Sequence, residues 1–264
     1  MNELVIDLTT PVVTVDALVT NDSTPPLSGT VDDSSATISV TVGGNTYPGT
    51  NLGATWSLGD DVIAALAEGT YDVTVSALDG AGNLGNDVTV DELVIELTTP
   101  AVKVEAHVTN DASPPLSGSV DVSTAAISVT VGGNTYPGSN DGITWSLGDD
   151  VIAALAEGTY DVTVAALDGA GNLGNDVTVD ELVIDLTTPT VTVNDLVTND
   201  PTPPLSGTVD DSTATISVTV GGNTYPGANL GATWSLSDDV IAAMAEGTYD
   251  VTVAALEGAG NVYN

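Results

Sequence analysis

The side chains best suited to chemistry in this sequence are carboxylates, because 37 Asp and Glu residues stand against a single Lys or Arg and a single His. Many of them lie in turn-forming stretches beside Asn, as in Asn21-Asp22 and in Asp79-Gly80-Ala81-Gly82-Asn83. Ca2+ takes about six to eight oxygen ligands from carboxylates, amides and backbone carbonyls. The chain has no Cys for a thiolate zinc site, and its one His, His107, cannot build an imidazole site. The residue types therefore favour calcium as the bound ion.

The formal net charge of -36 limits the partners that the chain can have. Nucleic acid is excluded, because phosphate binding requires Lys or Arg side chains. Membrane insertion is not expected either, since no apolar run approaches the roughly 18 residues of a spanning helix. A hydrophobic fraction of 42% nevertheless predicts a folded protein rather than a disordered acidic tail. Such a protein must offset its own repulsion through salt screening or bound cations.

Three copies of one pattern organise the chain. Glu-Leu-Val-Ile begins at residues 3, 92 and 181, and Pro-Pro-Leu-Ser-Gly begins at residues 25, 114 and 203, a step of 89 residues in each case. This step is too long for a solenoid unit but suits a small independent domain. We therefore predict domains at residues 7–95, 96–184 and 185–264, termed repeats 1, 2 and 3. Residues 1–6 are predicted to end a preceding repeat's last strand, and repeat 3 is predicted to lack its own last strand.

Short segments of each repeat alternate apolar and polar residues, which is typical of half-buried strands. In repeat 1 the predicted strands are Thr37–Val42, Tyr71–Ala77, 12–15, 27–31, 54–58 and 88–95. Only residues 60–68 have helix-like spacing, and there Asp60-Asp61 would cap a helix of one or two turns. About seven strands in one repeat predict an all-β chain of three tandem immunoglobulin-like antiparallel β-sandwich domains, arranged as an extended rod.

The aromatic residues fit this prediction. Leu66-Ala67-Glu68-Gly69-Thr70-Tyr71 has the form of a tyrosine corner, and it recurs at Tyr160 and Tyr249. A Trp stands one strand earlier in each repeat, at Trp56 and its two counterparts. We interpret these Trp and Tyr residues as core packing rather than as a carbohydrate-binding platform.

Sandwich topology indicates where the acidic residues converge. With the strands of a sandwich lettered A to G in chain order, the B–C loop contains Asp32 and the F–G loop runs from Asp79 to Asn83 in repeat 1. Both loops return to the pole at which strand A begins, and the A–B turn of the preceding domain, with Asn21-Asp22 in repeat 1, faces that pole. We therefore predict a Ca2+ site at each junction, although Asp and Asn also favour turns for purely local reasons. The candidate ligands are Asp7, Asp32, Asp79 and Asn83 in repeat 1; Asn21 and Asp22 with Glu96, Asp121, Asp168 and Asn172 at the first junction; and Asn110 and Asp111 with Asp185, Asp210, Glu257 and Asn261 at the second.

Five motifs in fixed order carry a family resemblance: Asp7-Leu8-Thr9-Thr10-Pro11, Pro25-Pro26-Leu27-Ser28-Gly29, Thr55-Trp56-Ser57-Leu58, Glu68-Gly69-Thr70-Tyr71 and the Asp79 to Asn83 loop. Together they resemble the bacterial Ig-like tandem repeats of the extender region in large repeats-in-toxin type surface adhesins. The resemblance implies a secreted cell-surface stalk whose domains and linkers are stiffened by Ca2+. The calcium-binding nonapeptides of such proteins, Gly-Gly-x-Gly-x-Asp, are absent, since Gly43-Gly44-Asn45-Thr46 departs at its fourth position.

An enzyme is not expected, because no acid, base or nucleophile stands apart from the repeat. The predicted function is a structural spacer of a cell-surface adhesin, with neighbouring repeats of the same parent chain as partners. One alternative is a glycan- or ice-binding module that uses the outward side chains of Thr37, Ser39, Thr41 and Thr74. Another is an extracellular filament, in which residues 2–6 of a second molecule complete the open sheet of repeat 3 head to tail.

Overall fold

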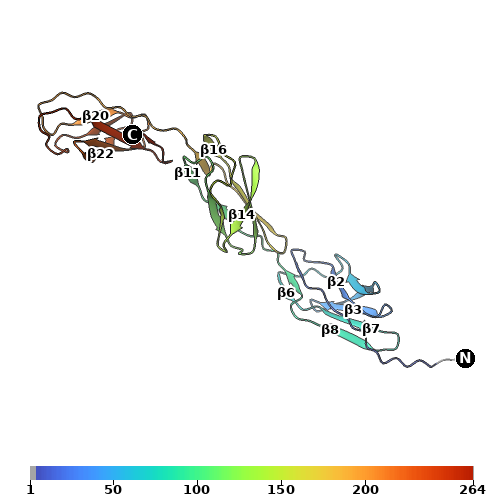
Figure 1. Cartoon of the computed structure of the whole chain (residues 1–264). Helices are drawn as coiled ribbons and strands as arrows, with labels where there is room; N and C mark the ends of the chain where they lie inside the picture. The colour runs from blue at the N-terminus through green and yellow to red at the C-terminus, as the bar shows by residue number, and fades with distance from the viewer. Residues whose placement is uncertain (1–3, 264) are drawn as a thin grey trace. The chain divides into compact units, whose positions relative to one another are not determined.

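The computed structural model describes residues 4–263 and is all-β, with strands in each of the three repeats (Figure 1). The part of the chain that it describes contains no helix long and apolar enough to cross a membrane. The chain divides into two compact units, which are described separately. The first comprises Met1–Val102, Val120–Ile127 and Ala165–Asn175, and the second comprises Lys103–Ser119, Ser128–Val164 and Asp176–Asn264.

Repeat 1 folds into two sheets. One has six strands in the order β2-β5-β4-β3-β7-β8, and the other has three in the order β1-β9-β6. The strands are β1 (Leu18–Thr20), β2 (Leu27–Thr30), β3 (Thr37–Val42), β4 (Asn45–Asn51), β5 (Thr55–Leu58), β6 (Gly69–Tyr71), β7 (Thr74–Leu78), β8 (Leu84–Val88) and β9 (Leu93–Ile95). The predicted immunoglobulin-like sandwich is confirmed, but the β1–β9 pair is parallel rather than antiparallel.

Alternation sets the central strands of the larger sheet. In β3 every second residue is buried, beginning with Ile38 and Val40, and the strand pairs with β4 and β7. Gly43 and Gly44 form the β3–β4 turn with φ of 58° and 79°, which residues with a Cβ rarely adopt. Strand β4, which contains Pro48, was not among the predicted strands. The proline is tolerated because β5 pairs only with the last two residues of β4.

The buried tryptophans explain the glycine of the Pro-Pro-Leu-Ser-Gly motif. Trp56 is fully buried, and its indole Nε1 donates a hydrogen bond to the carbonyl of Thr14 (2.7 Å). Gly29 lies directly beneath the ring, where a Cβ would overlap the Thr14 carbonyl. Trp145 and Trp234 are equally buried and make the equivalent bonds. The prediction that these residues form the core is therefore confirmed.

The predicted tyrosine corner is also confirmed. The hydroxyl of Tyr71 donates to the carbonyl of Ala67 (3.0 Å), and Tyr160 and Tyr249 make the same bond four residues back. The predicted helix over residues 60–68 is wrong, since this segment is irregular and Asp61 has a φ of 58°.

Neighbouring loops compete successfully for the backbone amides of this segment. The amide of Asp61 donates to the carbonyl of Thr24 (3.0 Å), and the amide of Leu66 donates to the carbonyl of Ser23 (2.9 Å). The amide of Ala64 donates to the Tyr47 hydroxyl (2.9 Å). In a helix over residues 60–68 the amides of Ala64 and Leu66 would bond to carbonyls four residues back, so their capture by other groups opposes the helix.

Repeat 2 contributes strands β10 (Val102–Val104), β11 (His107–Thr109), β12 (Leu116–Val120), β13 (Ala126–Val131), β14 (Asn134–Asn140), β15 (Thr144–Leu147), β16 (Gly158–Tyr160), β17 (Thr163–Leu167), β18 (Leu173–Val177) and β19 (Leu182–Ile184). Its second sheet, β11-β19-β16, matches β1-β9-β6.

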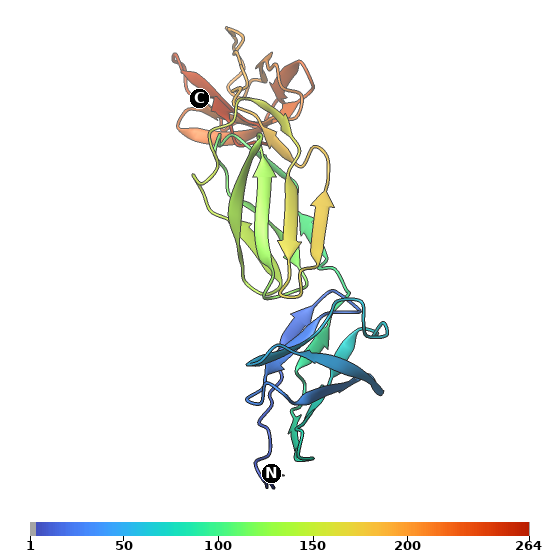
Figure 2. The same ribbon diagram turned by 90° about the vertical axis from the view of Figure 1, so that its right-hand side faces the viewer.

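Repeat 3 forms the six-stranded sheet β20-β23-β22-β21-β24-β25. The strands are β20 (Leu205–Thr208), β21 (Thr215–Val220), β22 (Asn223–Asn229), β23 (Thr233–Leu236), β24 (Val251–Leu256) and β25 (Val262–Tyr263). No counterpart of the three-stranded sheet occurs among its described residues. At the other end of the described chain, residues 4–12 enter repeat 1 without strand partners (Figure 2).

Candidate functional site: the acidic poles of the repeats

A hydrogen-bonded latch forms in the F–G loop of every repeat. In repeat 2 the Asp168 carboxylate accepts the amides of Ala170 (2.9 Å) and Asn172 (2.8 Å), and also the Asn172 side-chain amide (2.9 Å). Asn172 Nδ2 then donates to the backbone carbonyl of Glu96 (2.9 Å). Asp79 and Asn83 hold the carbonyl of Asp7 in the same way, and Glu257 and Asn261 hold that of Asp185.

These hydrogen bonds stabilise the ionised form of the loop acid. The side-chain amide of Asn83 lowers the pKa of Asp79, with further contributions from backbone amides. Burial acts to raise the pKa of Asp168, but the bonds from Asn172 and the loop amides outweigh it and leave the pKa below the ordinary value. The pKa of Glu257 is lowered by the same balance. The loop acids therefore serve as charged hydrogen-bond acceptors.

The residue between two repeats is fixed on both sides. Within the first unit, the amide of Glu96 donates to the carbonyl of Thr20 in repeat 1 (3.0 Å), while its carbonyl is held by Asn172 of repeat 2. Within the second unit, Asp185 is held likewise by Thr109 and Asn261. Neither linker residue therefore has a free backbone polar group.

The turn between β1 and β2 adds a second contact in the first unit. The amide of Asn21 donates to the carbonyl of Ala170 (3.0 Å), and the Asn21 side chain lies against Gly171, whose φ is 97°. Asn172 is only 6% exposed, whereas its counterpart Asn83 in repeat 1 is half-buried. The second unit repeats this arrangement, with Asn110 bonded to the carbonyl of Ala259.

Sequence reasoning missed two glutamates that hold the linkers. Glu68 Oε2 accepts the hydroxyl of Thr98 (2.6 Å) and the amide of Leu97 (3.1 Å), and the Thr98 hydrogen bond is the main cause of the lowered pKa of Glu68. Glu157 accepts the hydroxyl of Thr187 (2.6 Å) at the next linker. The signal was present, because Glu-Gly-Thr-Tyr and the Thr two residues after each linker acid recur together.

The predicted B–C loop ligands have local partners. Asp32 Oδ1 accepts the amide of Val12 (2.7 Å), and the Asp32 amide returns a bond to the Val12 carbonyl (3.1 Å). Asp121 forms the same pair with Ala101. Asp210 does so with Thr190, and this contact lowers the pKa of Asp210. Each of these residues therefore ties its B–C loop to the start of its repeat.

Asp22 and its counterparts Asp111 and Asp200 face a second aspartate of their own repeat rather than the linker. Asp22 accepts the amide of Thr24 (2.8 Å), and this bond is the main cause of its lowered pKa, with a smaller contribution from Asp60. Burial first, and then the hydrogen bond and charge of Asp22, raise the pKa of Asp60. The same pairing raises the pKa values of Asp149 and Asp238. The helix-capping interpretation of Asp60 and Asp61 is therefore wrong.

These contacts bear on the calcium prediction. Among residues 4–263, no three His, Cys, Asp or Glu side chains converge to hold a metal ion. Carboxylates do come together in pairs, as at Asp22 with Asp60 and at Glu257 with Asp185. Calcium also accepts amide and carbonyl oxygens, so such a pair supplies part of a ligand shell. The predicted ligand sets remain a prediction.

The family can now be assigned. A family model described as a bacterial Ig-like domain matches residues 10–95, 98–186 and 178–264. The chain belongs to the bacterial Ig-like domain family. Ig-like repeats of this kind are structural, non-enzymatic modules.

Several solved structures are similar to these Ig-like repeats. A "1.5-MDa bacterial ice-binding adhesin" is 22% identical, with 97% of this chain and 96% of that chain covered and a TM-score of 0.38. The "tetra-tandem repeat in extending region of large adhesion protein" is 27% identical, with 96% and 71% covered and a TM-score of 0.33. "Clostridium thermocellum CbhA fibronectin(III)-like modules" are 16% identical, with 65% and 93% covered and a TM-score of 0.41. No relative was found among the curated proteins compared.

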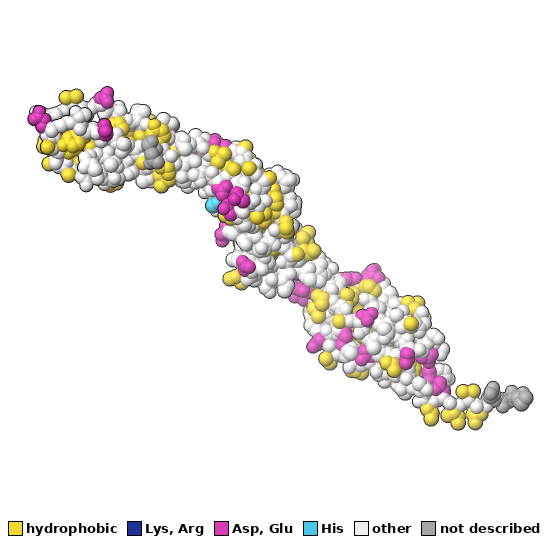
Figure 3. Space-filling view, in the orientation of Figure 1, with side chains coloured by type: hydrophobic (Ala, Val, Ile, Leu, Met, Phe, Trp, Pro, Cys, Tyr) yellow, Lys and Arg dark blue, Asp and Glu magenta, His cyan; other side chains and the backbone are white. Residues whose placement is uncertain are grey.

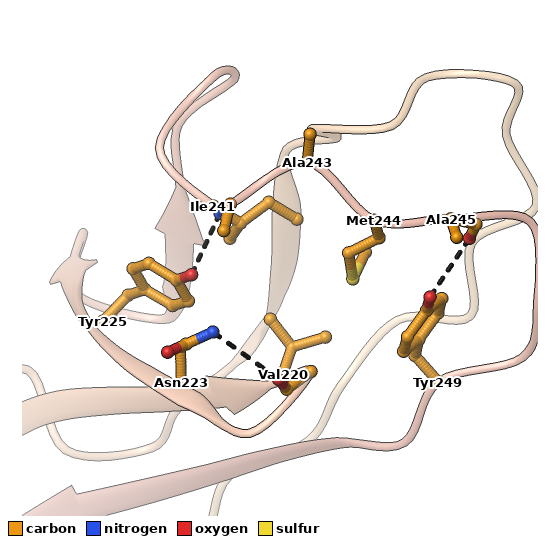
Figure 4. A pocket seen from close by; sticks show the side chains of 10 residues that line it. Val220, Asn223, Tyr225, Ile241, Ala243, Met244, Ala245 and Tyr249 are labelled. Carbon is orange, nitrogen blue, oxygen red and sulfur yellow. Dashed lines mark hydrogen bonds between the residues drawn. The ribbon is translucent and has the colours of Figure 1, made fainter.

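The third Ig-like repeat has a pocket of about 170 Å³ beside Tyr225, Met244 and Tyr249 (Figure 4). The Tyr225 hydroxyl accepts the amide of Ala242 (2.9 Å), and the Tyr249 hydroxyl donates to the carbonyl of Ala245 (3.1 Å). No Asp, Glu, Lys, Arg or His is among the described residues that line it. The pocket therefore offers no charged side chain for acid–base chemistry.

Proposed function

We propose that this chain is a spacer segment of a bacterial cell-surface adhesin, in which Ig-like repeats hold a distal binding domain away from the cell. The observation that carries the proposal is the linker residue bonded to both neighbours. Glu96 is held by Thr20 and Asn172, and Asp185 is held by Thr109 and Asn261. A spacer requires junctions that resist bending, and fixing both backbone groups of the linker restricts its rotation. One of the similar structures is itself described as the extending region of a large adhesion protein, which is the role proposed here.

We further propose that Ca2+ stiffens these junctions. A chain with a net charge of -36 repels itself, and a divalent ion between two carboxylates reduces that repulsion. The second junction supports this proposal best, because Asn261 joins the Glu257 carboxylate to the backbone of Asp185, Asp185 is among the groups that lower the pKa of Glu257, and Asn110 lies against the same loop at Gly260. The equivalent groups at the first junction are Asp168, Glu96 and Asn21. When bound, the ion would supply charge neutralisation and crosslinking.

Calcium titration of the full chain tests both proposals. Stability should rise by mass action, by about 2.7 kcal/mol at a hundred times the dissociation constant of one site. Small-angle scattering should show a longer maximum dimension with Ca2+ than with EDTA, and Mg2+ should substitute poorly. Glu96→Ala should weaken calcium binding at one junction and leave far-UV circular dichroism unchanged, because the backbone bond to Asn172 does not use the side chain. Glu246→Gln is the matched control, since this exposed residue loses the same charge away from the linkers.

Two contrary results would overturn different parts. If calcium and EDTA gave equal melting temperatures and scattering profiles, the calcium proposal would be wrong while the spacer proposal stood. If the maximum dimension matched freely jointed domains under all conditions, the spacer proposal itself would fail.

A further inference from the structure

One side of repeat 1 is a sheet surface without charge. Strands β3, β7 and β8 lie next to one another, and every second residue points outward. Asp87 is the only Asp or Glu in these three strands, all of which the structure describes, and it alternates onto the inner side, where its carboxylate accepts the amide of Val15 (3.0 Å). The outward side chains at the two ends of this surface define what we term the uncharged face: Thr37, Leu78 and Leu84 in one row, and Thr41, Thr74 and Val88 in the other.

The apolar side chains of the uncharged face are exposed to water. Leu78 and Leu84 pair across β7 and β8 and are 44% and 52% exposed, and Val88 is 70% exposed. Their counterparts in repeat 2, Leu167 and Leu173, are 45% and 53% exposed, although another repeat precedes them in the chain. Because the preceding repeat leaves this exposure unchanged, contacts along the chain do not cover these side chains. Exposed apolar side chains grouped on one surface are typical of an interaction site.

Repeat 3 carries the same surface. Its strands β21 and β24 contain no Asp or Glu and pair in the register of β3 and β7, with Leu256 exposed at the end of one row. The threonine hydroxyls beside this surface already have partners. Those of Thr41 and Thr46 bond to each other (2.9 Å), and so do those of Thr219 and Thr224 (2.8 Å). Covering such hydroxyls costs less free energy than covering hydroxyls without a partner.

The charge of the chain limits which partner suits the uncharged face. A cationic partner gains most at the acidic loops rather than on this surface. A sugar would be held by exposed aromatic rings, and the described strands β3, β7 and β8 contain none. A second copy of the chain, with a net charge of -36, is repelled wherever carboxylates meet. Figure 3 shows acidic side chains on every repeat, with uncharged and apolar surface between them. Two uncharged faces can therefore meet without opposing one carboxylate with another.

We propose that the uncharged face binds the same face of a second copy of this chain, so that two chains associate side by side through isologous contacts. Leu78, Leu84 and Val88 supply the apolar area that the contact buries. At about 4.8 Å between strands and about 3.3 Å per residue, the face covers about 250 Å². Each partner in a stable complex buries about 800 Å², so that one pair of faces is a weak contact. Recurrence of the face in repeat 3 adds a second contact between the same two chains.

Sedimentation equilibrium of the 264-residue chain in EDTA tests this proposal separately from the calcium proposal. The weight-average mass should rise with protein concentration. It should rise further between about 0.05 and 0.5 M NaCl, because salt screens the repulsion between two acidic chains. An association held by pairs of opposite charges would weaken with salt instead.

Charges placed on the uncharged face should prevent association. The triple variant Leu78→Asp, Leu167→Asp and Leu256→Asp should remain monomeric at 0.5 M NaCl, a concentration of about three Debye lengths per 10 Å or less, because it sets buried carboxylates against each other. The matched control is the triple variant Leu52→Asp, Ile143→Asp and Leu230→Asp. These exposed loop residues gain the same three charges away from the face, so that the control should associate like the wild type.

A thiol placed on the uncharged face gives a second readout. The chain has no Cys, so Ser76→Cys introduces a single thiol between the two rows of the face. Isologous contact brings two such thiols together, and with oxidised glutathione the disulfide-linked dimer should form at least about tenfold faster than from Leu52→Cys. A wild type that is monomeric at every concentration and salt would overturn the proposal. Association that persists in the face variant, association that is lost in its control, or equal crosslinking of the two thiol variants would overturn it as well.

Discussion

Replacing Asn172 by Ala tests whether the F–G latch holds the repeat junction. Asn172 Nδ2 makes one hydrogen bond to the Asp168 carboxylate and one to the Glu96 carbonyl, both 2.9 Å long. A bond to a charged group contributes about 1.5–3 kcal/mol, and a neutral one about 1 kcal/mol. The substitution removes the donor of both hydrogen bonds, and it leaves the Asp168 carboxylate buried with one bond fewer. We therefore expect repeat 2 to lose about 3 kcal/mol of unfolding free energy.

Scanning calorimetry and hydrogen exchange of the full chain measure this loss. For a domain of this size, 1 kcal/mol corresponds to a shift of about 4–8 °C, so the melting temperature of repeat 2 should fall by roughly 12 °C or more. Asn83→Ala is the matched control, because Asn83 makes the same two bonds but is half-buried. In the Asn83→Ala variant, water can bond to the Asp79 carboxylate and the Asp7 carbonyl, so we expect repeat 1 to lose about 1 kcal/mol of unfolding free energy. Equal shifts of the melting temperature for the two variants would refute the view that contacts from repeat 1 shield the Asp168–Asn172 hydrogen bonds from water.

Three further changes test other parts of repeat 2. Gly118→Ala should cost about 3 kcal/mol in denaturant unfolding, because its Cβ would overlap the adjacent backbone and the Trp145 indole. Tyr160→Phe should cost about 1 kcal/mol by the same assay, since it removes the bond to the Ala156 carbonyl (2.9 Å). The pKa of Asp149 is raised, so its ionised form opposes folding, and stability should rise as the pH falls toward that pKa. Asp149→Asn should raise the melting temperature at neutral pH and abolish this rise.

Each of these changes has a control and a contrary result. Gly169→Ala, at a glycine with open space around it, should be tolerated, and an equal loss there would contradict the packing argument for Gly118. A Tyr160→Phe variant as stable as the wild type would show that the corner bond adds nothing. Glu246→Gln removes one charge without an aspartate pair, so the same gain from it would assign the Asp149 effect to net charge alone.

The sequence predicted the parts of the fold that depend on local pattern. Alternation over residues 37–42 identified β3, and the spacing of Tyr71 from Ala67 identified the tyrosine corner. The helix at residues 60–68 could not be excluded, because the carbonyls of Ser23 and Thr24 that capture its amides lie far away in the sequence. The parallel pairing of β9 was hidden for the same reason, since three residues carry little periodicity and their direction depends on tertiary packing.

The sequence predicted which acidic residues gather at the ends of the repeats, but not which groups they bind. Topology placed Asp168, Asn172 and Glu96 at one end of repeat 2, and hydrogen bonds join them there. The sequence could not show that Asn172 binds the backbone of Glu96 rather than its carboxylate. Nor could it show that Asp22 turns toward Asp60, because both depend on side-chain directions that residue types leave open.

The parallel pairing of β1 with β9 has a mechanical consequence. Residues 7–17 enter repeat 1 just before β1, and β9 leads directly into the linker at Glu96, which is itself bonded to Thr20. When tension pulls the two ends of the repeat apart, parallel strands are drawn along each other in opposite directions. Their hydrogen bonds then bear the load together in shear instead of opening one after another. Rupture must break them at once, which slows forced unfolding of repeat 1 and of repeat 2, where β11 and β19 pair in the same way.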